Sequence, residues 1–308
     1  MNKLTKISMT ALSTALIAGS VQAMDYSISG GASIAYTSVN TSSDTNPWGM
    51  GDSITFSTSG DLDNGMTVSV SLEMDDHGSD AIDDKSIKID TGNGVIGFAT
   101  SVGGIGGIGT IANKVPNAMT PVFEATDGTD YGQADQKMSS AGQWGYKHTV
   151  GGIGISIGYT PGGNTNGGAD TGWSLSYDGL MDGLEVGYGQ QDDGTTSESE
   201  TAFIKYVTGG ITVAYQKSKV DYESTSSSDE DATHYGVSLA VNDELSVSAG
   251  RQDVEIGTNA SEEENTGVGG SYTMGSVKVG LAFNQAANVG GSAGVDYEAT
   301  IGSITFSF

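Results

Sequence analysis

The chain has 308 residues, with 12 Lys and Arg against 38 Asp and Glu, and a formal net charge of −26. So acidic a composition argues against nucleic acid as a partner, because binding to phosphates needs clustered Lys and Arg. The absence of cysteine excludes a disulfide framework, a thiol nucleophile and a cysteine metal site. Glycine accounts for 48 residues, about double its usual share of ~7%.

Met1–Ala23 has the features of a secretory signal peptide. Lys3 and Lys6 supply a positive start, Ile7–Ala18 is a short and mostly apolar centre, and Val21-Gln22-Ala23 offers a small-residue cleavage site. Cleavage would leave 10 basic and 38 acidic residues and a net charge of −28. No later apolar run reaches the ~18 residues of a membrane-spanning helix. We therefore expect residues 24–308 to be exported without a membrane helix.

Met66–Met74 shows the pattern that recurs along the chain. Met66, Val68, Val70, Leu72 and Met74 alternate with small polar residues and Glu73. Side chains of a strand point to opposite faces with a period of two, so the segment has one apolar and one polar face. Sixteen segments follow this scheme: Ile28–Tyr36, Ile54–Thr58, Met66–Met74, Lys85–Ile89, Val95–Thr100, Trp144–Val150, Ile153–Tyr159, Trp173–Tyr177, Leu184–Tyr188, Ala202–Tyr206, Ile211–Tyr215, Tyr235–Val241, Leu245–Ala249, Val268–Met274, Val277–Phe283 and Tyr297–Phe308.

The connections between these segments alternate between two kinds. Seven are tight turns with the Gly, Asn and Asp that short hairpins require: Gly60–Gly65, Asp90–Gly94, Gly151-Gly152, Asp178–Gly183, Thr208–Gly210, Asn242–Glu244 and Gly275-Ser276. The others are longer and polar, for example Gln191–Ser199, Asp221–Asp231 and Asp253–Glu264. Short turns on one side and long loops on the other predict an up-and-down meander.

A sheet of this kind must hide its apolar face, and aromatic residues at the segment ends indicate how. Tyr36, Tyr159, Tyr177, Tyr188, Tyr206, Tyr215 and Phe308 lie on the apolar phase near segment ends. Aromatic girdles of a membrane barrel have this placement, although tyrosine is also a good strand former. In lipid every backbone polar group must be paired, so the sheet must close. Sixteen strands enclose a lumen too wide for side chains to fill, which predicts an aqueous channel.

The alanine-terminated signal, the Ser/Thr/Gly alternation, the sixteen segments and the terminal Gly302–Phe308 resemble Gram-negative general porins, most closely the alphaproteobacterial type. The resemblance implies an all-β, 16-stranded antiparallel transmembrane β-barrel in the outer membrane. It also implies a homotrimer, and an insertion signal at Ile304, Phe306 and Phe308 that the outer-membrane insertion machinery reads. Tyr297, Ala299 and Ile301 are out of phase with Ile304, so we expect a bulge near Gly302-Ser303.

Gly103–Ser140, after the fifth segment, is too long for an ordinary connection. In the porins that this chain resembles, that loop folds into the lumen and narrows it, with loop acids facing basic residues on the wall. The resemblance thus makes the loop the pore constriction, with Glu124, Asp127, Asp130 and Asp135 as its acids. Glu124, Asp127 and Asp130 are favoured because they lie in its middle. The alternative is that all four are only solvated loop acids.

Alternation predicts which charged side chains of the strands face the lumen. The expected lumen-facing wall residues are Lys88, Lys147, Lys205, Lys278, Glu73 and Glu185. Four lysines give the wall of the lumen only a few positive charges. Rings of acids favour the entry of cations into a channel. We therefore expect a modest preference for cations. Lys85, Lys217, Lys219 and Arg251 lie on the apolar phase near loops and are expected at the water-facing rim, because a lipid-facing charge costs ~2–4 kcal/mol at mid-membrane.

Two matches to enzyme motifs are chance products of abundant glycine. Gly104–Gly109 fits G-x-G-x-x-G, but no helix-forming pattern follows and Pro116 interrupts the sequence. Gly154–Gly158 fits G-x-S-x-G, but Ser156 sits inside an alternating strand rather than a strand-to-helix turn. No catalytic residue and no cofactor are therefore predicted.

Metal binding by this chain is an open question. His77, His148 and His234 are dispersed and lack metal-ligand spacing. The acidic groups Asp75-Asp76, Asp229–Asp231 and Glu262–Glu264 offer the oxygen ligands that Ca²⁺ or Mg²⁺ take, although solvated acidic loops are the simpler interpretation.

The main hypothesis is a porin that passes ions and small hydrophilic solutes by diffusion, with outer-membrane lipid and the solutes as its partners. One alternative within the same fold is a substrate-selective channel. From other classes, a soluble Ca²⁺-dependent Gly/Asp-rich β adhesin lacks the repeat that such proteins carry, and a barrel enzyme lacks a catalytic set.

Overall fold

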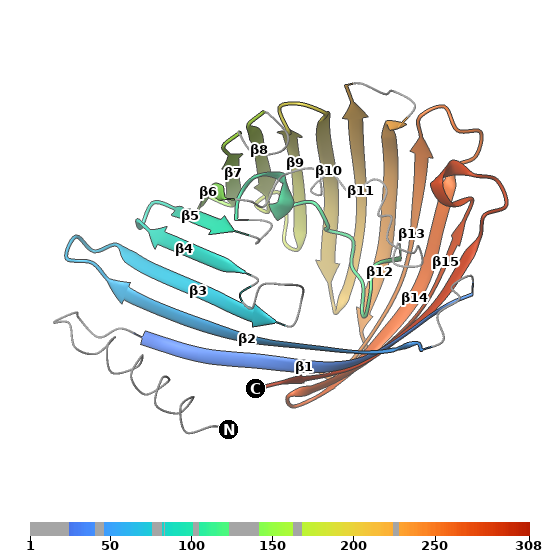
Figure 1. The fold of residues 1–308 in the computed structure, drawn as a ribbon, viewed down its shortest axis with the longest axis horizontal. Coiled ribbons are helices and arrows are strands. Elements are labelled where there is room, and N and C mark those ends of the chain that lie inside the picture. Colours follow the sequence, from blue (N-terminus) through green and yellow to red (C-terminus); the bar gives the residue numbers. More distant parts are fainter. Residues whose placement is uncertain are drawn as a thin grey trace.

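The computed structural model describes residues 25–40, 46–75, 82, 84–100, 105–122, 142–162, 168–223 and 228–308. Met1–Ala23, predicted to be a signal peptide, lies outside them. The described residues form sixteen β-strands (Figure 1). Their bounds are β1 Asp25–Val39, β2 Trp48–Asp61, β3 Thr67–Asp75, β4 Lys85–Asp90, β5 Val95–Thr100, β6 Gln143–Val150, β7 Ile153–Thr160, β8 Asp170–Tyr177, β9 Leu184–Asp192, β10 Ser197–Thr208, β11 Ile211–Tyr222, β12 Glu230–Ala240, β13 Leu245–Ile256, β14 Glu263–Met274, β15 Val277–Ala287 and β16 Tyr297–Ser307.

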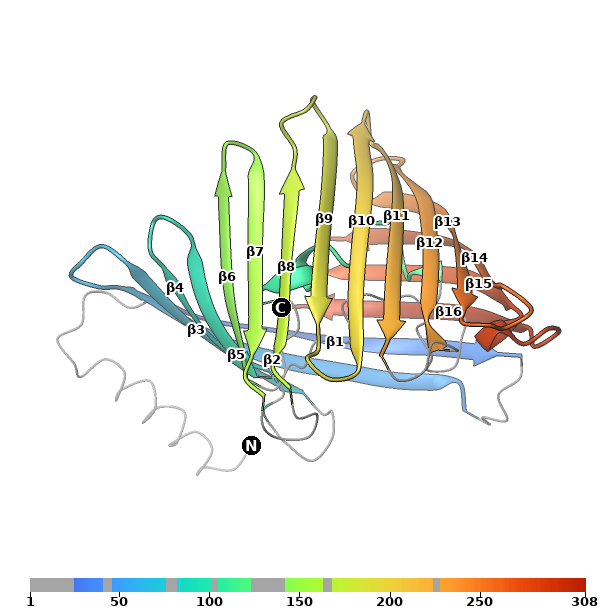
Figure 2. The same cartoon turned by 90° about the horizontal axis from the view of Figure 1, so that it is seen from above.

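The strands form one closed antiparallel barrel in which each strand pairs with its neighbours in the chain. Closure comes from β1 and β16, which pair from Gly31 opposite Ser307 to Val39 opposite Ala299. Seen from above in Figure 2, β6 to β11 stand side by side while β1 and β2 run across them. The predicted fold class, strand number and meander are therefore confirmed. Within the described residues, no helix is both long enough and apolar enough to cross a membrane.

The tight turns lie where the sequence predicts them, and most of their glycines adopt the left-handed backbone that such turns need. Gly209 and Gly210, between β10 and β11, have φ of 53° and 84°. Residues with a Cβ rarely adopt these angles, which glycine reaches at no steric cost.

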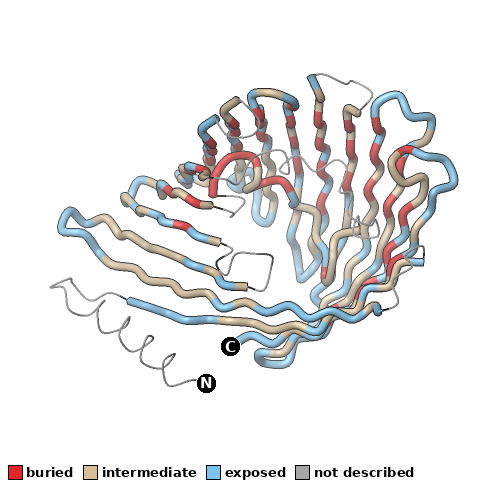
Figure 3. Tube along the Cα trace, viewed as in Figure 1, coloured by how far each residue is buried: buried red, intermediate tan, exposed pale blue. Residues whose placement is uncertain are grey.

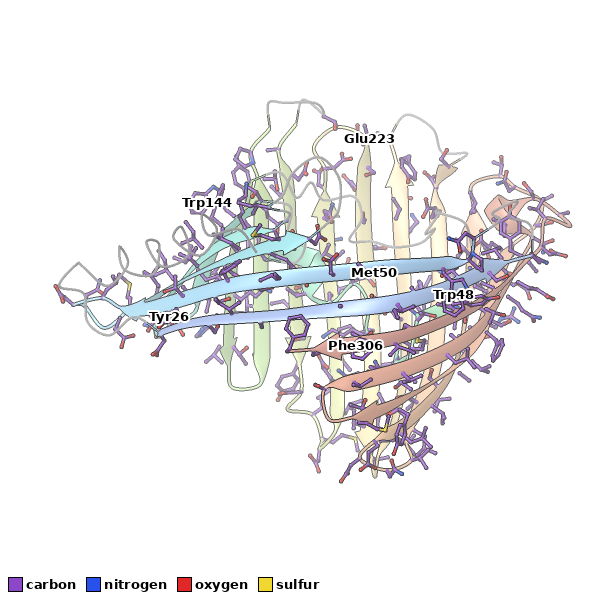
Figure 4. All side chains as sticks on the ribbon, turned by 60° about the horizontal axis from the view of Figure 1, so that its bottom comes forward. Tyr26, Trp48, Met50, Trp144, Glu223 and Phe306 are labelled. Carbon is purple, nitrogen blue, oxygen red and sulfur yellow. The ribbon has the colours of Figure 1, made fainter. Side chains whose placement is uncertain are left out.

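The membrane-facing half of the strands places apolar side chains outside and small polar side chains inside. In β7, the Ile157 side chain is 50% exposed on the outer face, whereas Ser156 is buried on the inner face. Tyr26 and Trp48 lie towards opposite ends of the β1–β2 ribbon (Figure 4). Tyr36 meets Trp48 edge-on at 5.1 Å between ring centroids, and Trp173 meets Tyr188 at 5.7 Å. Such outward aromatics suit the two interfaces of a bilayer.

At the long-loop end the pattern reverses, and several strands run further than the sequence predicts. In β11, Lys217 and Lys219 point outwards whereas Val220 is fully buried on the inside. Val220 has inner-face apolar counterparts on β12 and β13, where Ala232, Val254 and Ile256 form a cluster. The predicted loops Gln191–Ser199, Asp221–Asp231 and Asp253–Glu264 are wrong at their ends, which belong to β9–β14. The error arose because the charged residues indicated loops, whereas at this end of the barrel they lie on the outer face of paired strands.

The same reversal corrects the expected bulge in β16. Its pairing with β15 is continuous from Val277 opposite Phe306 to Ala286 opposite Tyr297, with no extra residue at Gly302-Ser303. Ala299 and Ile301 are buried on the inner face, where they pack with Ala282 and Ala286. Apolar residues change face along an unbroken strand, so no bulge is needed to reconcile the two phases. Figure 3 shows buried and exposed positions alternating along the strands of the barrel wall.

Candidate channel constriction

The segment Ile105–Val122, which follows β5, lies along the inner wall of the barrel as the teal ribbon of Figure 1. It contains the short 3₁₀ helix Gly107–Thr110, and residues 111–121 are irregular. Its side chains rest on glycines of the wall. The side-chain contacts run in order around the barrel: Ile105 against Gly97, Ile111 against Gly189, Val115 against Gly236, Val122 against Gly250 and Gly267, and Met119 against Gly269 and Gly280. At Gly145 it is the backbone of Ile105 that approaches the wall.

Gln216, on the inner face of β11, is the strongest polar anchor of this segment. Its Nε2 donates to the carbonyls of Ile111 at 3.0 Å and Ala112 at 2.7 Å, while its Oε1 accepts the Lys114 N–H at 2.8 Å. Gln216 is buried and also donates to Thr201 Oγ1 at 2.8 Å. A loop that leaves its own backbone groups unpaired needs such partners, because a buried polar group without one is costly.

Three further wall side chains hold the segment on either side of Gln216. Ser174 Oγ donates to the Gly107 carbonyl at 3.0 Å and lies 2.8 Å from Thr110 Oγ1. Ser248 Oγ accepts the Ala118 N–H at 2.8 Å. Asn284 Nδ2 donates to the Pro121 carbonyl at 2.8 Å. The attachments extend from β8 to β15, so the described loop segment follows a large part of the inner circumference.

Charged groups meet where the loop crosses β9 and β10. Lys114 Nζ lies 3.2 Å from Glu185 Oε1, and Lys205 Nζ lies 2.5 Å from Glu185 Oε2. Lys114 also sits 5.2 Å from the centroid of the Phe203 ring, a cation–π arrangement. One carboxylate is therefore shared by one ammonium of the loop and one of the wall.

The structure places the other predicted wall residues on the inner phase of their strands. Lys88 lies opposite Ser69 and Gly97, and Glu73 lies opposite Thr55. Lys147 is opposite the buried Ser156 and close enough to Lys88 for their charges to repel. Lys278 is opposite Thr273 and Thr305, near the short-turn end. Lys88, Lys147 and Lys278 are exposed to the lumen.

Glu124, Asp127, Asp130 and Asp135 lie outside the described residues, so their place in the constriction stays a prediction. Sequence reasoning missed Lys114 and Gln216. The alternation of side chains could have predicted that Gln216 points inwards, because it lies between the outward-facing Tyr215 and Lys217. Lys114 had no such signal, because an irregular loop has no period.

The C-terminal residues lie on the outer surface beside β1. Ile304, Phe306 and Phe308 are 39%, 41% and 77% exposed. Phe308 exchanges two backbone hydrogen bonds with Gly30, its N–H donating at 2.9 Å and its carbonyl accepting at 2.7 Å. The terminal residue therefore extends the β1–β16 seam. A role in insertion stays a prediction.

Of the basic residues predicted at the rim, Lys85 and Lys217 are exposed and Lys219 and Arg251 are half-buried. Three of the four are paired with acids. Lys217 contacts Asp231 at 2.9 Å, Lys219 contacts Asp221 at 2.7 Å, and Arg251 contacts Asp253 and Glu264 at 2.6 and 3.0 Å. Lys85 is exposed at the start of β4.

The metal candidates remain dispersed in the described part of the chain. There, no group of three or more His, Asp or Glu side chains is arranged to hold a metal ion. His77 and Asp76 lie outside that part. His148 stacks on Tyr146 on the outer face, with 6.4 Å between ring centroids, and His234 is buried on the inner face. Binding of Ca²⁺ or Mg²⁺ to acidic loops stays a prediction.

The dismissal of the G-x-S-x-G motif is confirmed by its position. Ser156 lies in the middle of β7, opposite Lys147 and Ser174. No strand-to-helix turn is present there to expose a nucleophile.

Comparison with known proteins supports this architecture. Residues 8–291 match the family described as Gram-negative porin. A solved structure titled "Asymmetric conductivity of engineered proteins" aligns with a TM-score of 0.69 and 13% identity, covering 92% of this chain and 100% of that one. Two mutants of the Rhodopseudomonas blastica porin align with a TM-score of 0.64 and 12% and 13% identity, with the same coverage. No curated protein matches. The chain belongs to the Gram-negative porin family.

Proposed function

We propose that this outer-membrane porin passes ions and small hydrophilic solutes by passive diffusion, with a modest preference for cations. Porins are channels and not enzymes. One observation carries the proposal: a closed sixteen-stranded barrel that is apolar outside, polar inside and lined by a loop attached to its inner wall. A lumen of this circumference is too wide for wall side chains to fill, so water and dissolved ions can enter it.

The cation preference is supported by the charge of the chain. Acids outnumber Lys and Arg by 38 to 12, and the long-loop ends of the strands carry many exposed acids. In the described residues, Asp192, Glu198 and Glu255 are exposed, and Glu200, Asp221 and Glu264 are half-buried. An acidic mouth raises the local concentration of cations. The loop acids Glu124, Asp127 and Asp130 are proposed to extend this field into the constriction.

Reversal potentials in a KCl gradient test the preference. Wild-type protein in planar bilayers should give a potential of the sign that K⁺ permeation produces. A variant with Glu124→Gln, Asp127→Asn and Asp130→Asn should reduce it. A wild-type potential of the sign set by Cl⁻ would contradict the proposal.

A matched control separates the loop from the mouth. The triple variant Asp192→Asn, Glu198→Gln and Glu200→Gln removes the same number of carboxylates from the outer surface of the long-loop end. It should change the potential less than the loop variant does. An equal change of the reversal potential in the two variants would mean that the cation preference does not arise specifically from the loop acids.

Trimer assembly and recognition of Ile304, Phe306 and Phe308 by the insertion machinery are proposed from the family alone. These three side chains are exposed on the outer surface of the barrel, where another protein could bind them.

A further inference from the structure

The loop and the wall share one cluster of charge in the described lumen, formed by Lys114, Glu185 and Lys205. Glu185 of β9 lies directly opposite Lys205 of β10 in the strand register, and Lys114 reaches the same carboxylate from the loop. The three side chains are 22%, 22% and 26% exposed. They are thus fixed by contacts but still open to the lumen, where passing ions experience their charge.

We propose that Glu185 is a specificity-determining residue of the channel, because its single carboxylate offsets two ammonium groups at the constriction. The inference rests on the proposed function, since it concerns which ions the same lumen admits. With Glu185 in place the cluster carries one net positive charge. Without that carboxylate it would carry two, and the wall beside the loop would attract anions.

The position of the loop does not depend on this ion pair. Gln216 accepts the Lys114 N–H and donates to the carbonyls of Ile111 and Ala112, and Ser174 and Ser248 hold the segment on either side. The Phe203 ring also supports the Lys114 ammonium. Substitutions at Glu185 or Lys114 can therefore change charge while the backbone stays attached to the wall.

Charge counting gives an unusual pattern of expected results. Glu185→Gln raises the cluster from one to two positive charges, so the K⁺/Cl⁻ permeability ratio should fall. Lys114→Gln leaves a neutral pair, so the ratio should rise. The double variant returns the cluster to one positive charge, so the ratio should return to the wild-type value although both Glu185 contacts are lost. A single charge ~8 Å from an ion path in water, screened by ~0.1 M salt, changes the ratio by about twofold.

The test measures reversal potentials of the four proteins in planar bilayers at low and high salt. The shifts should shrink at high salt, because the Debye length falls from ~10 Å at 0.1 M to ~3 Å at 1 M. Glu298→Gln, which removes an exposed carboxylate from the outer face of β16, is the matched control and should leave the ratio unchanged. Heat-modifiable migration on gels establishes that each variant is folded.

Shifts of the same sign in the two single variants, or a double variant that keeps either shift, would overturn the inference in favour of loop displacement. Unchanged ratios in all variants would overturn it as well. A wild-type protein that is folded and inserted but does not conduct would instead contradict the proposed function. If Glu185→Gln fails to fold, Lys205→Gln supplies the test, because it also leaves a neutral pair and must raise the ratio.

Discussion

Gln216 shows how one inward-facing side chain of a strand can fix a long loop. Its amide satisfies two loop carbonyls, Ile111 and Ala112, and one loop N–H, that of Lys114, at distances of 2.7–3.0 Å. An amide is suited to this role because it is both donor and acceptor. A wall of serine and threonine alone would not reach so many groups of one backbone segment.

Replacing Gln216 with leucine should release this part of the loop. Each buried group left unpaired costs about 1–3 kcal/mol, so hydrogen exchange at the Lys114 amide should accelerate and open-channel current noise should increase. Gln285→Leu is the control, because Gln285 is exposed on the outer face of β15. Unchanged protection of the Lys114 amide in Gln216→Leu would contradict the anchoring role.

Asp193 organises the connection between β9 and β10. Its carboxylate accepts hydrogen bonds from the N–H groups of Thr195, Thr196 and Ser197, and from the hydroxyls of Thr196 and Ser197. Burial alone would raise the pKa of the Asp193 carboxyl, but the bonds from Thr196, Ser197 and Thr195 outweigh it and hold the pKa well below its usual range.

Asp193→Asn should therefore loosen this connection in a pH-dependent way. The stabilisation by ionised Asp193 is complete above its unfolded pKa of about 3.9 and is lost as pH falls towards the lower folded pKa. At neutral pH, amides of Thr195–Ser197 should exchange about tenfold faster in the variant, or ~1.4 kcal/mol. The difference from wild type should narrow below about pH 4. If these amides exchanged at the wild-type rate in Asp193→Asn at pH 7, the proposed role of Asp193 would be refuted. Asp182→Asn is the control, because Asp182 is an exposed acid in another turn.

At the scale of elements, the glycines of the inner wall let the loop lie flat on the strands. A Cβ at Gly145 of β6 would collide with the backbone of Ile105, including its carbonyl carbon at 2.6 Å. Glycine is found in strands where another backbone approaches closely. Its abundance in this chain thus has a local cause wherever the loop touches the wall.

Gly145→Ala should displace the start of the loop. The overlap involves backbone, which cannot move aside like a flexible side chain, so we expect about 1–3 kcal/mol of destabilisation and an altered single-channel conductance. Gly302→Ala is the matched control, because its Cβ would have its nearest neighbours at 3.8 Å. It should change stability by no more than about 0.5 kcal/mol. Denaturant unfolding in detergent and conductance recordings measure both effects, and equal behaviour of the two variants would exclude the close-approach explanation.

The strands could be predicted from sequence because a period of two survives in each, as in β7. Their long-loop ends could not, because apolar residues such as Val220 move to the inner face there while Lys217 and Lys219 remain outside. The alternation of side chains along β9 and β10 also predicted that Glu185 and Lys205 point into the lumen. It could not give Lys114 as their partner, since only the three-dimensional path of the loop brings residue 114 to β9.

At the scale of the whole molecule, the exterior and the lumen divide the chemistry between them. The outer surface is apolar in the middle of the barrel, with aromatic residues towards its ends and ion pairs at the long-loop rim. The inside combines small polar residues with the few lysines and glutamates of the wall. This division fits a barrel in lipid around a wet lumen, and the net charge of −26 supports the proposed preference for cations.

Single-channel recording of purified wild-type protein in planar bilayers tests this account most directly. The account predicts discrete conductance steps that rise with KCl concentration, as expected for ions moving through a water-filled pore. Folded and inserted protein that leaves the bilayer sealed to K⁺ and Cl⁻ would contradict it.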